Sequence, residues 1–531
     1  MRFIDISTLR ELAARSWVRR SLLALPVLAL MTLFIVTELR GVDFGSQWDE
    51  KDWHVEPARK MVKTGVFLPH QYIYPTFSKW LMLLPALPAG LAAALNSGSD
   101  PELIRGAMTQ ALAGPEYVLT ARGIFIVVSG LAILWVYLAA LALRRPWWEA
   151  FIAAAGLALS WEYAYQARYL ANDCLLAQFA ALTLLLLAVF HRTRRTRWLY
   201  GAALAAGLAT STKYPGVLLL LPIALTSWFA QASRPADDRL LRVVALCAMA
   251  FGAYLVTTPG TVLEPYVFLS DARRVTYLYA TGHFGYTVSG PARHWQLALE
   301  YLGLCFFSPS KVVAALMAAG AIWGAVGWWR HDRRFGAVLI LFPGVFLAFF
   351  CMSYRVVVVR NYLLLGPFGA LLAARGIADV TGRLRSRWLR APLLAAFAAV
   401  AIWQAAFLIR AGERIRWPDS QRDTREALAY VAQHPNHTFR VSGLVRAIAA
   451  AQRLVMPANV TQGPADSVVF FCEAEGPGPY SWKTNDPWLT EAVFGPMEVN
   501  INWYSSWQGG RDRILVMTTE KARGTEVKLA E

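Results

Sequence analysis

Residues 118–143 read VLTARGIFIVVSGLAILWVYLAALAL, and this stretch decides the fold. It holds a single charged residue, Arg122, in 26 positions. As a helix it would be about 39 Å long, enough to cross the roughly 30 Å hydrocarbon core of a bilayer. Arg144 and Arg145 follow it directly. The stretch therefore predicts a membrane-spanning helix that ends in a basic loop.

The composition of the whole chain agrees with this interpretation. Of 531 residues, 56% are hydrophobic and 16% are charged, against about 25% charged in soluble domains. These values exclude a soluble or a disordered protein. The net charge of +17 comes from basic residues in short runs between apolar segments, which is typical of cytoplasmic loops rather than of nucleic-acid binding. The five cysteines form no CxxC pair, so they are interpreted as small core residues.

Eleven apolar runs are predicted to cross the membrane. All strongly basic loops fall on the cytoplasmic side only if two other apolar runs do not cross the membrane. These are Phe77–Leu95, which Pro85 and Pro88 interrupt, and His294–Phe307; both are predicted to lie in the outer interface. The predicted crossings are Ser21–Leu39, Val118–Leu143, Glu149–Tyr165, Cys174–Phe190, Trp198–Ser211, Gly216–Ala230, Leu240–Thr258, Val312–Trp329, Phe335–Ser353, Asn361–Ala374 and Ala391–Ile409.

This topology divides the chain into three parts. Residues 1–20 form a cytoplasmic N-terminus, residues 21–409 form the transmembrane domain with a first external loop at 41–117, and residues 410–531 form an outer domain. The tail predicts a small α/β domain with a helix over 423–434 and strands at 439–441, 467–471 and 513–517. We therefore expect a polytopic α-helical membrane protein, with its outer side facing the periplasm of a bacterial inner membrane.

Polar residues that could support chemistry concentrate in the outward-facing segments. Asp49 and Glu50 follow the first crossing; such a pair is either ordinary interfacial solvation or contains a general base held near the bilayer surface. Lys79 either extends its amine to the interface or neutralises a phosphate.

Further cations lie in three short outer turns, and one of these turns also holds an acid, Asp173. Each cation alone is more simply structural or topological, but their common side favours an anionic ligand. The candidates for substrate and phosphate binding are Lys79, Arg168, Asp173, Lys213, His283, Arg360 and Tyr362.

The order of these features resembles the GT-C glycosyltransferase superfamily, in the branch of the protein O-mannosyltransferases and the lipid A aminoarabinose transferase. The resemblance covers about Leu22 to Gly376. It rests on five motifs in order: Asp49-Glu50, Tyr74-Pro75 with Lys79, Arg168 with Asp173, Thr212-Lys213-Tyr214-Pro215, and Arg360-Asn361-Tyr362 with Pro367. Three positions depart from the family pattern: Tyr214 replaces a common glycine, Asn361 splits the Arg-Tyr pair, and Ser78 stands where a carboxylate is common.

The resemblance implies a glycosyltransferase that uses a sugar on a polyprenyl or dolichyl phosphate and inverts the anomeric carbon. Asp49 would deprotonate an extracytoplasmic acceptor, which is a glycan, a lipid or a protein. Lys79, Arg168, Lys213 or Arg360 would stabilise the departing phosphate. The chain has no glycine-rich phosphate loop, in agreement with a donor that is not a nucleotide sugar. No obligatory metal or other cofactor is predicted; a divalent metal stays open as an alternative.

Two alternatives remain at this stage. A transporter or flippase of lipid-linked or small anionic substrates would show internal repeats and broken helices with polar residues at mid-membrane, and the break at Thr212–Pro215 has no matching partner elsewhere. The outer domain is either a structural cap or an acceptor-binding surface. The second interpretation rests on tryptophans among glycines and prolines, namely Trp482, Trp488, Trp503 and Trp507.

Overall fold

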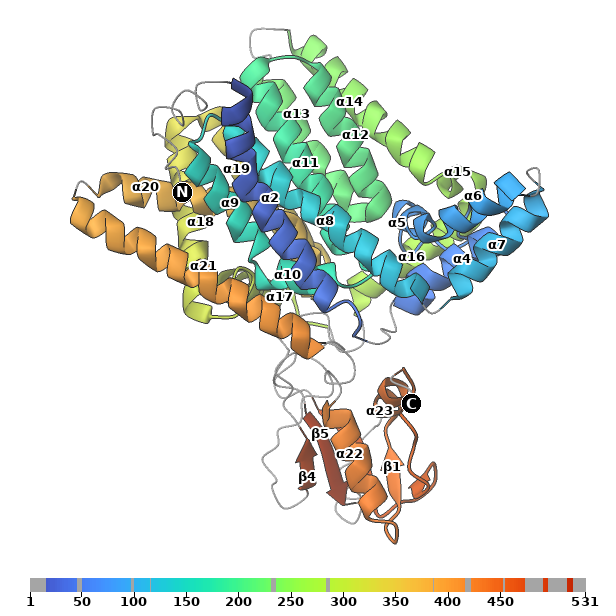
Figure 1. The fold of residues 1–531 in the computed structure, drawn as a ribbon. Helices are drawn as coiled ribbons and strands as arrows, with labels where there is room; N and C mark the ends of the chain where they lie inside the picture. The colour runs from blue at the N-terminus through green and yellow to red at the C-terminus, as the bar shows by residue number, and fades with distance from the viewer. Residues whose placement is uncertain are drawn as a thin grey trace, which may run out of the picture.

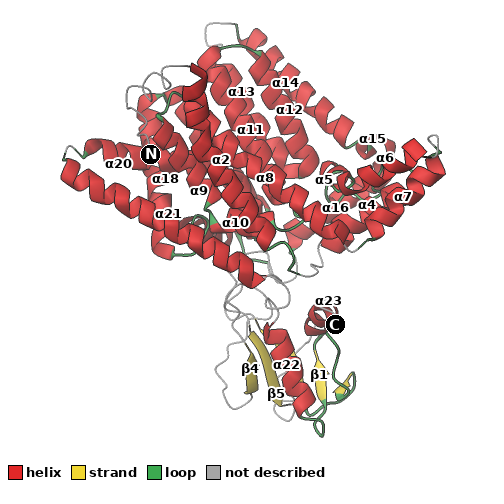
Figure 2. Cartoon of the chain, in the orientation of Figure 1, coloured by secondary structure: helices red, strands yellow, loops and turns green. Residues whose placement is uncertain are grey.

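The structure is a computed structural model of the full chain (Figure 1). It describes residues 16–44, 50–96, 100–114, 116–230, 235–282, 287–384, 386–415, 422–451, 454–472, 490–494 and 513–518. Within these ranges the chain is helical except in a small C-terminal domain, where all five strands lie (Figure 2).

In the described part of the chain, nine helical segments are long and apolar enough to cross a membrane. This confirms the prediction of a polytopic α-helical membrane protein. The long single helices are α2 (Ser16–Arg40), α8 (Glu116–Ala142), α11 (Asn172–Thr193), α14 (Ala236–Thr257), α18 (Lys311–His331), α19 (Arg333–Ser353) and α21 (Arg387–Ile415). The other two segments are Phe77–Asn96 and Val359–Arg383, the latter made of the turn η4 (Val359–Leu365) and α20 (Gly366–Arg383).

Three further predicted crossings are built from shorter helices. Residues 216–230 lie in η3 (Tyr214–Leu219) and α13 (Leu220–Ala230), and residues 198–211 lie in α12 (Arg197–Thr212). The predicted single crossing Glu149–Tyr165 is instead two helices, α9 (Trp147–Ala158) and α10 (Trp161–Ala167). The break occurs because the side chain of Ser160 caps α10 by accepting a hydrogen bond from the backbone of Tyr163.

The stretch Phe77–Asn96 is not one continuous helix. It consists of α5 (Phe77–Leu81), the turn η2 (Leu84–Ala86) and α6 (Leu87–Asn96). The interruption lies at Pro85, whose ring and missing N–H disfavour a helix interior. Its position in the outer interface stays a prediction, because the whole stretch has the length and composition of a span.

The remaining helices belong to the segments predicted to face outward. The single turn η1 (Lys51–Val55) runs into α4 (Glu56–Thr64), and α7 (Pro101–Ala113) follows later in the same loop. A second group contains α15 (Gly260–Leu263), α16 (Pro265–Thr281) and α17 (Pro291–Leu304). Helices α4 to α7 lie together with α15 and α16 at one end of the molecule, away from α20 and α21 (Figure 1).

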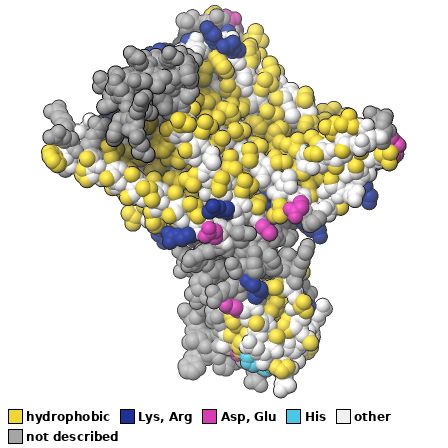
Figure 3. All heavy atoms as spheres, viewed as in Figure 1, with side chains coloured by type: hydrophobic (Ala, Val, Ile, Leu, Met, Phe, Trp, Pro, Cys, Tyr) yellow, Lys and Arg dark blue, Asp and Glu magenta, His cyan; other side chains and the backbone are white. Residues whose placement is uncertain are grey.

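The surface of the helical domain fits a lipid environment. Large apolar side chains such as Leu241, Phe251 and Ile322 are exposed on the long helices, and Figure 3 shows a broad hydrophobic face over them. In the same view, charged side chains gather along the edge next to the C-terminal domain. An apolar belt bordered by charge is the pattern expected of a membrane-embedded bundle.

Glycines bring α18 and α20 into direct backbone contact. A Cβ on Gly324 would lie 1.8 Å from the carbonyl oxygen of Leu372, and a Cβ on Gly376 would lie 2.0 Å from that of Gly320. Gly320 and Gly324 form a GxxxG pair, which allows membrane helices to pack closely without a hydrophobic driving force. The tight contact holds the helix that follows η4.

The C-terminal domain is a small α/β unit, as predicted. Its sheet has the order β2-β1-β3-β5-β4, with β1 parallel to β2 and β3, and β5 antiparallel to β3 and β4. Helix α22 (Arg422–Gln433) and the sheet share a core that includes Val431, Phe439 and Val516. The other elements are β1 (Phe439–Val441), α23 (Gly443–Ala451), β2 (Val460–Thr461), β3 (Ser467–Cys472), β4 (Thr490–Phe494) and β5 (Arg513–Thr518). The four tryptophans of the proposed acceptor surface lie outside the described residues.

Replacing Gly324 by alanine is expected to lower the free energy of unfolding by about 1–3 kcal/mol, because the added methyl group has no space against the backbone of α20. Gly344→Ala in α19 is the matched control, since a Cβ there would meet no atom within 4 Å. Thermal unfolding of the purified variants in detergent checks this. Equal melting temperatures for the two variants would contradict the close packing.

Candidate functional site

The carboxylate of Asp173 brings together two of the predicted cations. Its Oδ1 lies 2.6 Å from Nζ of Lys213, and its Oδ2 lies 3.4 Å from Nε of Arg360. All three side chains are buried. The three residues come from α11, from the junction of α12 with η3, and from η4. The cluster thus joins three distant segments of the chain.

Local sequence places each member of this cluster at the end of a helix. Asp173 lies in the first turn of α11, where the helix dipole stabilises a negative charge. Lys213 is extended, with φ −154° and ψ 133°, and ends α12; Pro215, two residues later, has no backbone N–H with which an α-helix could continue. Arg360 lies in the tight turn η4 that leads into α20. Helix ends therefore direct all three side chains to one site.

Asn361 and two tyrosines extend the cluster. Nζ of Lys213 donates a hydrogen bond to Oδ1 of Asn361 at 2.6 Å, and Nδ2 of Asn361 donates to the hydroxyl of Tyr279 at 3.4 Å. Arg360 donates to the hydroxyl of Tyr74 at 3.5 Å. Sequence reasoning treated Asn361 as a departure from the family pattern, whereas here it is a direct partner of Lys213.

Lys79 holds the first external loop from inside. Its Nζ donates to the backbone oxygens of Gln71 at 3.0 Å and of Tyr74 at 2.6 Å, and the side chain is fully buried. Those contacts position Tyr74 over the cluster, where its ring also faces the amine of Lys213, 5.9 Å from the ring centroid. These contacts give Lys79 a structural role, and its binding of a phosphate stays a prediction.

The electrostatic field at the site is positive. His54 is buried and stacks on Tyr74, with 5.3 Å between the ring centroids. Burial holds the pKa of His54 well below its usual range, and the charges of Lys79, Arg360 and Lys213 lower it further. His54 is therefore neutral at physiological pH. Three cations lower the pKa of this one ring, so the field at His54 favours an anion over an added cation.

A cavity of about 450 Å³ opens beside this cluster. Lys213, Arg360 and Asn361 line its polar end. Its other walls are mainly apolar or aromatic and include Phe268, Val275, Phe350, Val356 and Val358. An apolar chamber with cations at one end is complementary to a molecule with an anionic head and a hydrocarbon chain.

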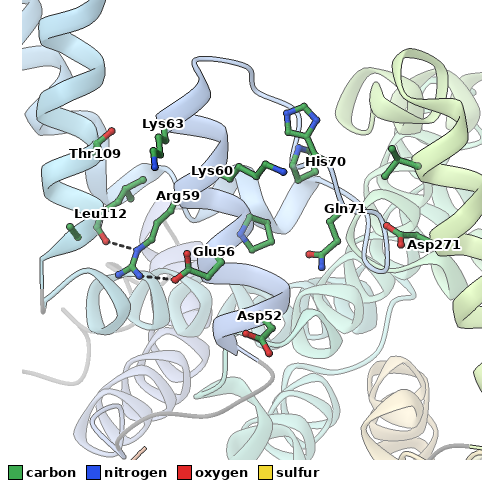
Figure 4. Close-up of a pocket in the computed structure, with 14 residues that line it drawn as sticks. Asp52, Glu56, Arg59, Lys60, Lys63, His70, Gln71, Thr109, Leu112 and Asp271 are labelled. Atoms are coloured by element: carbon green, nitrogen blue, oxygen red, sulfur yellow. Dashed lines mark hydrogen bonds and ion pairs between the residues drawn. The ribbon is translucent and has the colours of Figure 1, made fainter.

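A second cavity, of about 790 Å³, lies between α4, α7 and α16 and is lined mainly by polar residues (Figure 4). In its wall Arg59 contacts Glu56 at 3.0 Å and donates to the backbone oxygen of Leu112, also at 3.0 Å. The same segments line both cavities. Asp52, Gln71 and Asp271 line the polar cavity, and their near neighbours Trp53, Ile73 and Ala272 line the apolar one.

Contacts between the first external loop and α15–α16 hold this dividing wall. The backbone N–H of Tyr72 donates to Asp271 at 2.6 Å, and its hydroxyl donates to Glu264. His70 also contacts Glu264. The wall between the cavities is therefore a packed, hydrogen-bonded structure.

Three of the predicted residues, Arg168, Tyr362 and Glu50, are engaged elsewhere. Arg168 forms a fully buried ion pair with Glu38 of α2 at 2.9 Å. Tyr362 is hydrogen-bonded through its hydroxyl to Nε2 of His294 at 2.6 Å. Asp49 and His283 lie outside the described residues.

Glu50 pairs with Arg122 of α8 and accepts a hydrogen bond from the backbone N–H of Leu170 at 2.8 Å. It therefore fastens the loop to the bundle next to the Asp173 turn. Each scaffold pair joins a residue outside the predicted crossings, Arg168 or Glu50, to one inside a crossing, Glu38 or Arg122. The sequence places these charges but does not show which of them pair.

Among the residues that the structure describes, no group of three His, Cys, Asp or Glu side chains is arranged to hold a metal ion. The absence of an obligatory metal stays a prediction of the sequence.

Comparison with known proteins gives one family and several structures. Residues 109–262 match the family described as dolichyl-phosphate-mannose-protein mannosyltransferase, which confirms the resemblance over that segment. ArnT from Cupriavidus metallidurans in the apo state has a similar structure, with 13% identity, a TM-score of 0.45, and 94% of this chain and 98% of that chain covered. ArnT from the same organism bound to undecaprenyl phosphate is also similar, with 14% identity, a TM-score of 0.45, and 98% of this chain and 100% of that chain covered. No curated protein sequence matches the chain.

Replacing Arg168 by glutamine is expected to lower the free energy of unfolding by about 3–5 kcal/mol, because Glu38 would stay buried without its counter-charge. The double variant Glu38→Gln/Arg168→Gln should recover most of that loss. Arg40→Gln is the control: its pair with Glu413 is exposed and contributes at most about 1 kcal/mol. Thermal unfolding that is insensitive to Arg168→Gln would show that the ion pair does not hold the bundle.

Proposed function

We propose that this protein is a membrane glycosyltransferase that transfers a sugar from a polyprenyl-phosphate donor to an acceptor on the outer side of the membrane. The observation that carries the proposal is the apolar cavity with Lys213 and Arg360 at its polar end. The match of residues 109–262 to a dolichyl-phosphate-mannose-protein mannosyltransferase family supports the same reaction class. That segment contains both Asp173 and Lys213.

The charge balance of the cluster supports a phosphate as the group that is bound. Lys213 and Arg360 both contact Asp173, and these two cations together with Lys79 lower the pKa of His54, so the field that a phosphate would meet is positive. A phosphate that approaches from the cavity would gain charge-assisted hydrogen bonds from the lysine amine and the guanidinium group. The hydrocarbon chain of the lipid would occupy the aromatic walls.

The same cations support the chemistry of the leaving group. In the proposed reaction the acceptor oxygen attacks the anomeric carbon, and the bond from that carbon to the phosphate oxygen breaks with inversion. The polyprenyl phosphate leaves as an anion, and the acceptor proton passes to a carboxylate. Lys213 and Arg360 would stabilise the negative charge that develops on the phosphate.

Asp49 is the carboxylate that we propose as the base. Glu50, its neighbour in sequence, is already engaged by Arg122 and by the backbone of Leu170. Those contacts suit Glu50 to hold the loop in place and leave the proton transfer to Asp49. Glu50 also lies beside Asp173 and Arg360 in the wall of a small void, so the chain passes close to the cation cluster at this point.

The polar cavity on the other side of the wall supports a hydrophilic acceptor. Its lining carries acids, bases and the amide of Gln71 (Figure 4), which suits hydroxyl groups and charges rather than a hydrocarbon chain. A lipid-linked donor from one side and a polar acceptor from the other would meet at the loop that carries Asp49. The acceptor is a glycan, a lipid headgroup or a protein.

Asp49→Asn is expected to abolish transfer and to leave the melting temperature within about 2 °C of the wild type, because the amide cannot accept the acceptor proton. Glu50→Gln is the matched control. It should lower the melting temperature, since it removes the charged carboxylate that pairs with buried Arg122. Release of polyprenyl phosphate and thermal unfolding measure the two effects. Near-normal turnover by Asp49→Asn would reassign the base, first to Glu50.

The donor is tested with purified protein in detergent, offered mannosyl, glucosyl and aminoarabinosyl undecaprenyl phosphate and, separately, nucleotide sugars, with a membrane extract as the source of acceptor. Release of undecaprenyl phosphate from a lipid-linked donor is expected. Lys213→Met and Arg360→Met should each weaken use of that donor by about 1–3 kcal/mol, whereas Arg105→Gln on the exposed surface of α7 should not. Turnover of nucleotide sugars alone, or no binding of undecaprenyl phosphate, would overturn the proposal.

A further inference from the structure

A small enclosed void lies on the far side of Tyr74 from the apolar cavity. Tyr74 and Arg360 line both spaces, so they form the partition between them. As packed, the void leaves no room for a water molecule. Apart from Leu170 and Ala171, its lining residues are polar: Glu50, His54, Tyr74, Asn172, Asp173 and Arg360.

Two residues of this lining carry hydrogen-bonding atoms that find no partner in the described part of the chain. Neither Oδ1 nor Nδ2 of Asn172 has a partner among the described residues, although the residue is only 2% exposed. The same holds for Nδ1 of His54, in a residue that is 3% exposed. Most buried polar atoms in folded proteins are hydrogen-bonded, because leaving one without a partner costs free energy. Three such atoms around one void point to a ligand.

We propose that this void is the closed form of the subsite for the sugar of the donor, and that Asn172 and His54 hydrogen-bond to the sugar hydroxyl groups once the ring of Tyr74 moves aside. This inference rests on the proposed function. It adds to it the residues that recognise the transferred group.

The chemistry of the three atoms suits a sugar. An amide offers both a donor and an acceptor, and each sugar hydroxyl group can do the same. His54 is neutral because of burial and the nearby cations, so it can hydrogen-bond to a hydroxyl group without adding charge beside the phosphate site. Buried polar groups of this kind also reject a sugar that lacks the matching hydroxyl group, because they would then stay unpaired.

The position of the void suits the bond that breaks. Arg360 and Asp173 belong both to its wall and to the cation cluster. A sugar in the void would therefore have its anomeric carbon next to the phosphate held by the cations. Glu50, which follows the proposed base Asp49 in the sequence, also lines the void. Movement of Tyr74 requires separation from His54, on which it stacks, and from Arg360.

Asn172→Leu tests the proposal, because leucine has nearly the shape of asparagine but no hydrogen-bonding atoms. With the undecaprenyl-phosphate sugar that the wild type uses, kcat/KM is expected to fall roughly tenfold or more, the size of a lost hydrogen bond to a substrate. Affinity for undecaprenyl phosphate without a sugar should stay within about twofold of the wild type. The melting temperature should stay equal or rise, because the substitution removes buried atoms that have no partner.

Asn361→Leu is the matched control, since its amide is already bound to Lys213. It should lower the melting temperature and the affinity for undecaprenyl phosphate together. Wild-type kcat/KM in Asn172→Leu would overturn the sugar subsite, and so would a parallel loss of stability and of undecaprenyl-phosphate affinity, which indicates a structural role. A wild-type protein that neither binds undecaprenyl phosphate nor turns over its sugar derivatives would instead overturn the proposed function.

Discussion

The buried carboxylate of Asp173 is the interaction on which the rest of the outer site depends. A lysine and an arginine packed between membrane helices repel each other and lose their hydration. A single carboxylate at the start of α11 offsets both costs by contacting Lys213 and Arg360. It thereby fixes the junction of α12 with η3 and the turn η4 against α11. Removing it would take the shared carboxylate away from two buried cations, and buried charges that lose a counter-charge are costly.

The same balance explains why the cluster suits ligand binding and not only stability. Lys213 and Arg360 share the carboxylate of Asp173 and line a cavity, and with Lys79 they depress the pKa of His54. The ion pairs Glu38–Arg168 and Glu50–Arg122 are instead buried within the scaffold. Those pairs hold α2, α8 and the first external loop in place, so that the Asp173 cluster can face the cavity.

Tyr74 connects the scaffold of the first external loop to the cation cluster. Lys79 fixes its backbone, His54 packs on its ring, and Arg360 contacts its hydroxyl. Because Tyr74 also separates the apolar cavity from the void beside Asn172, movement of one ring would join a lipid-binding space to a polar one. A donor that carries a hydrocarbon chain, a phosphate and a sugar would match the apolar cavity, the cation cluster and the polar void in that order.

The sequence by itself determined the helical membrane fold, the α/β tail and the outer turns that hold Asp173, Lys213 and Arg360, because hydrophobic runs and helix-ending prolines act over a few residues. Only the tertiary structure decided which charges meet. Arg168 and Lys213 look alike in sequence, yet one pairs with Glu38 and the other with Asp173 and Asn361. Such pairing depends on packing between helices far apart in the chain, as does the burial of the Asn172 amide; no local pattern records it.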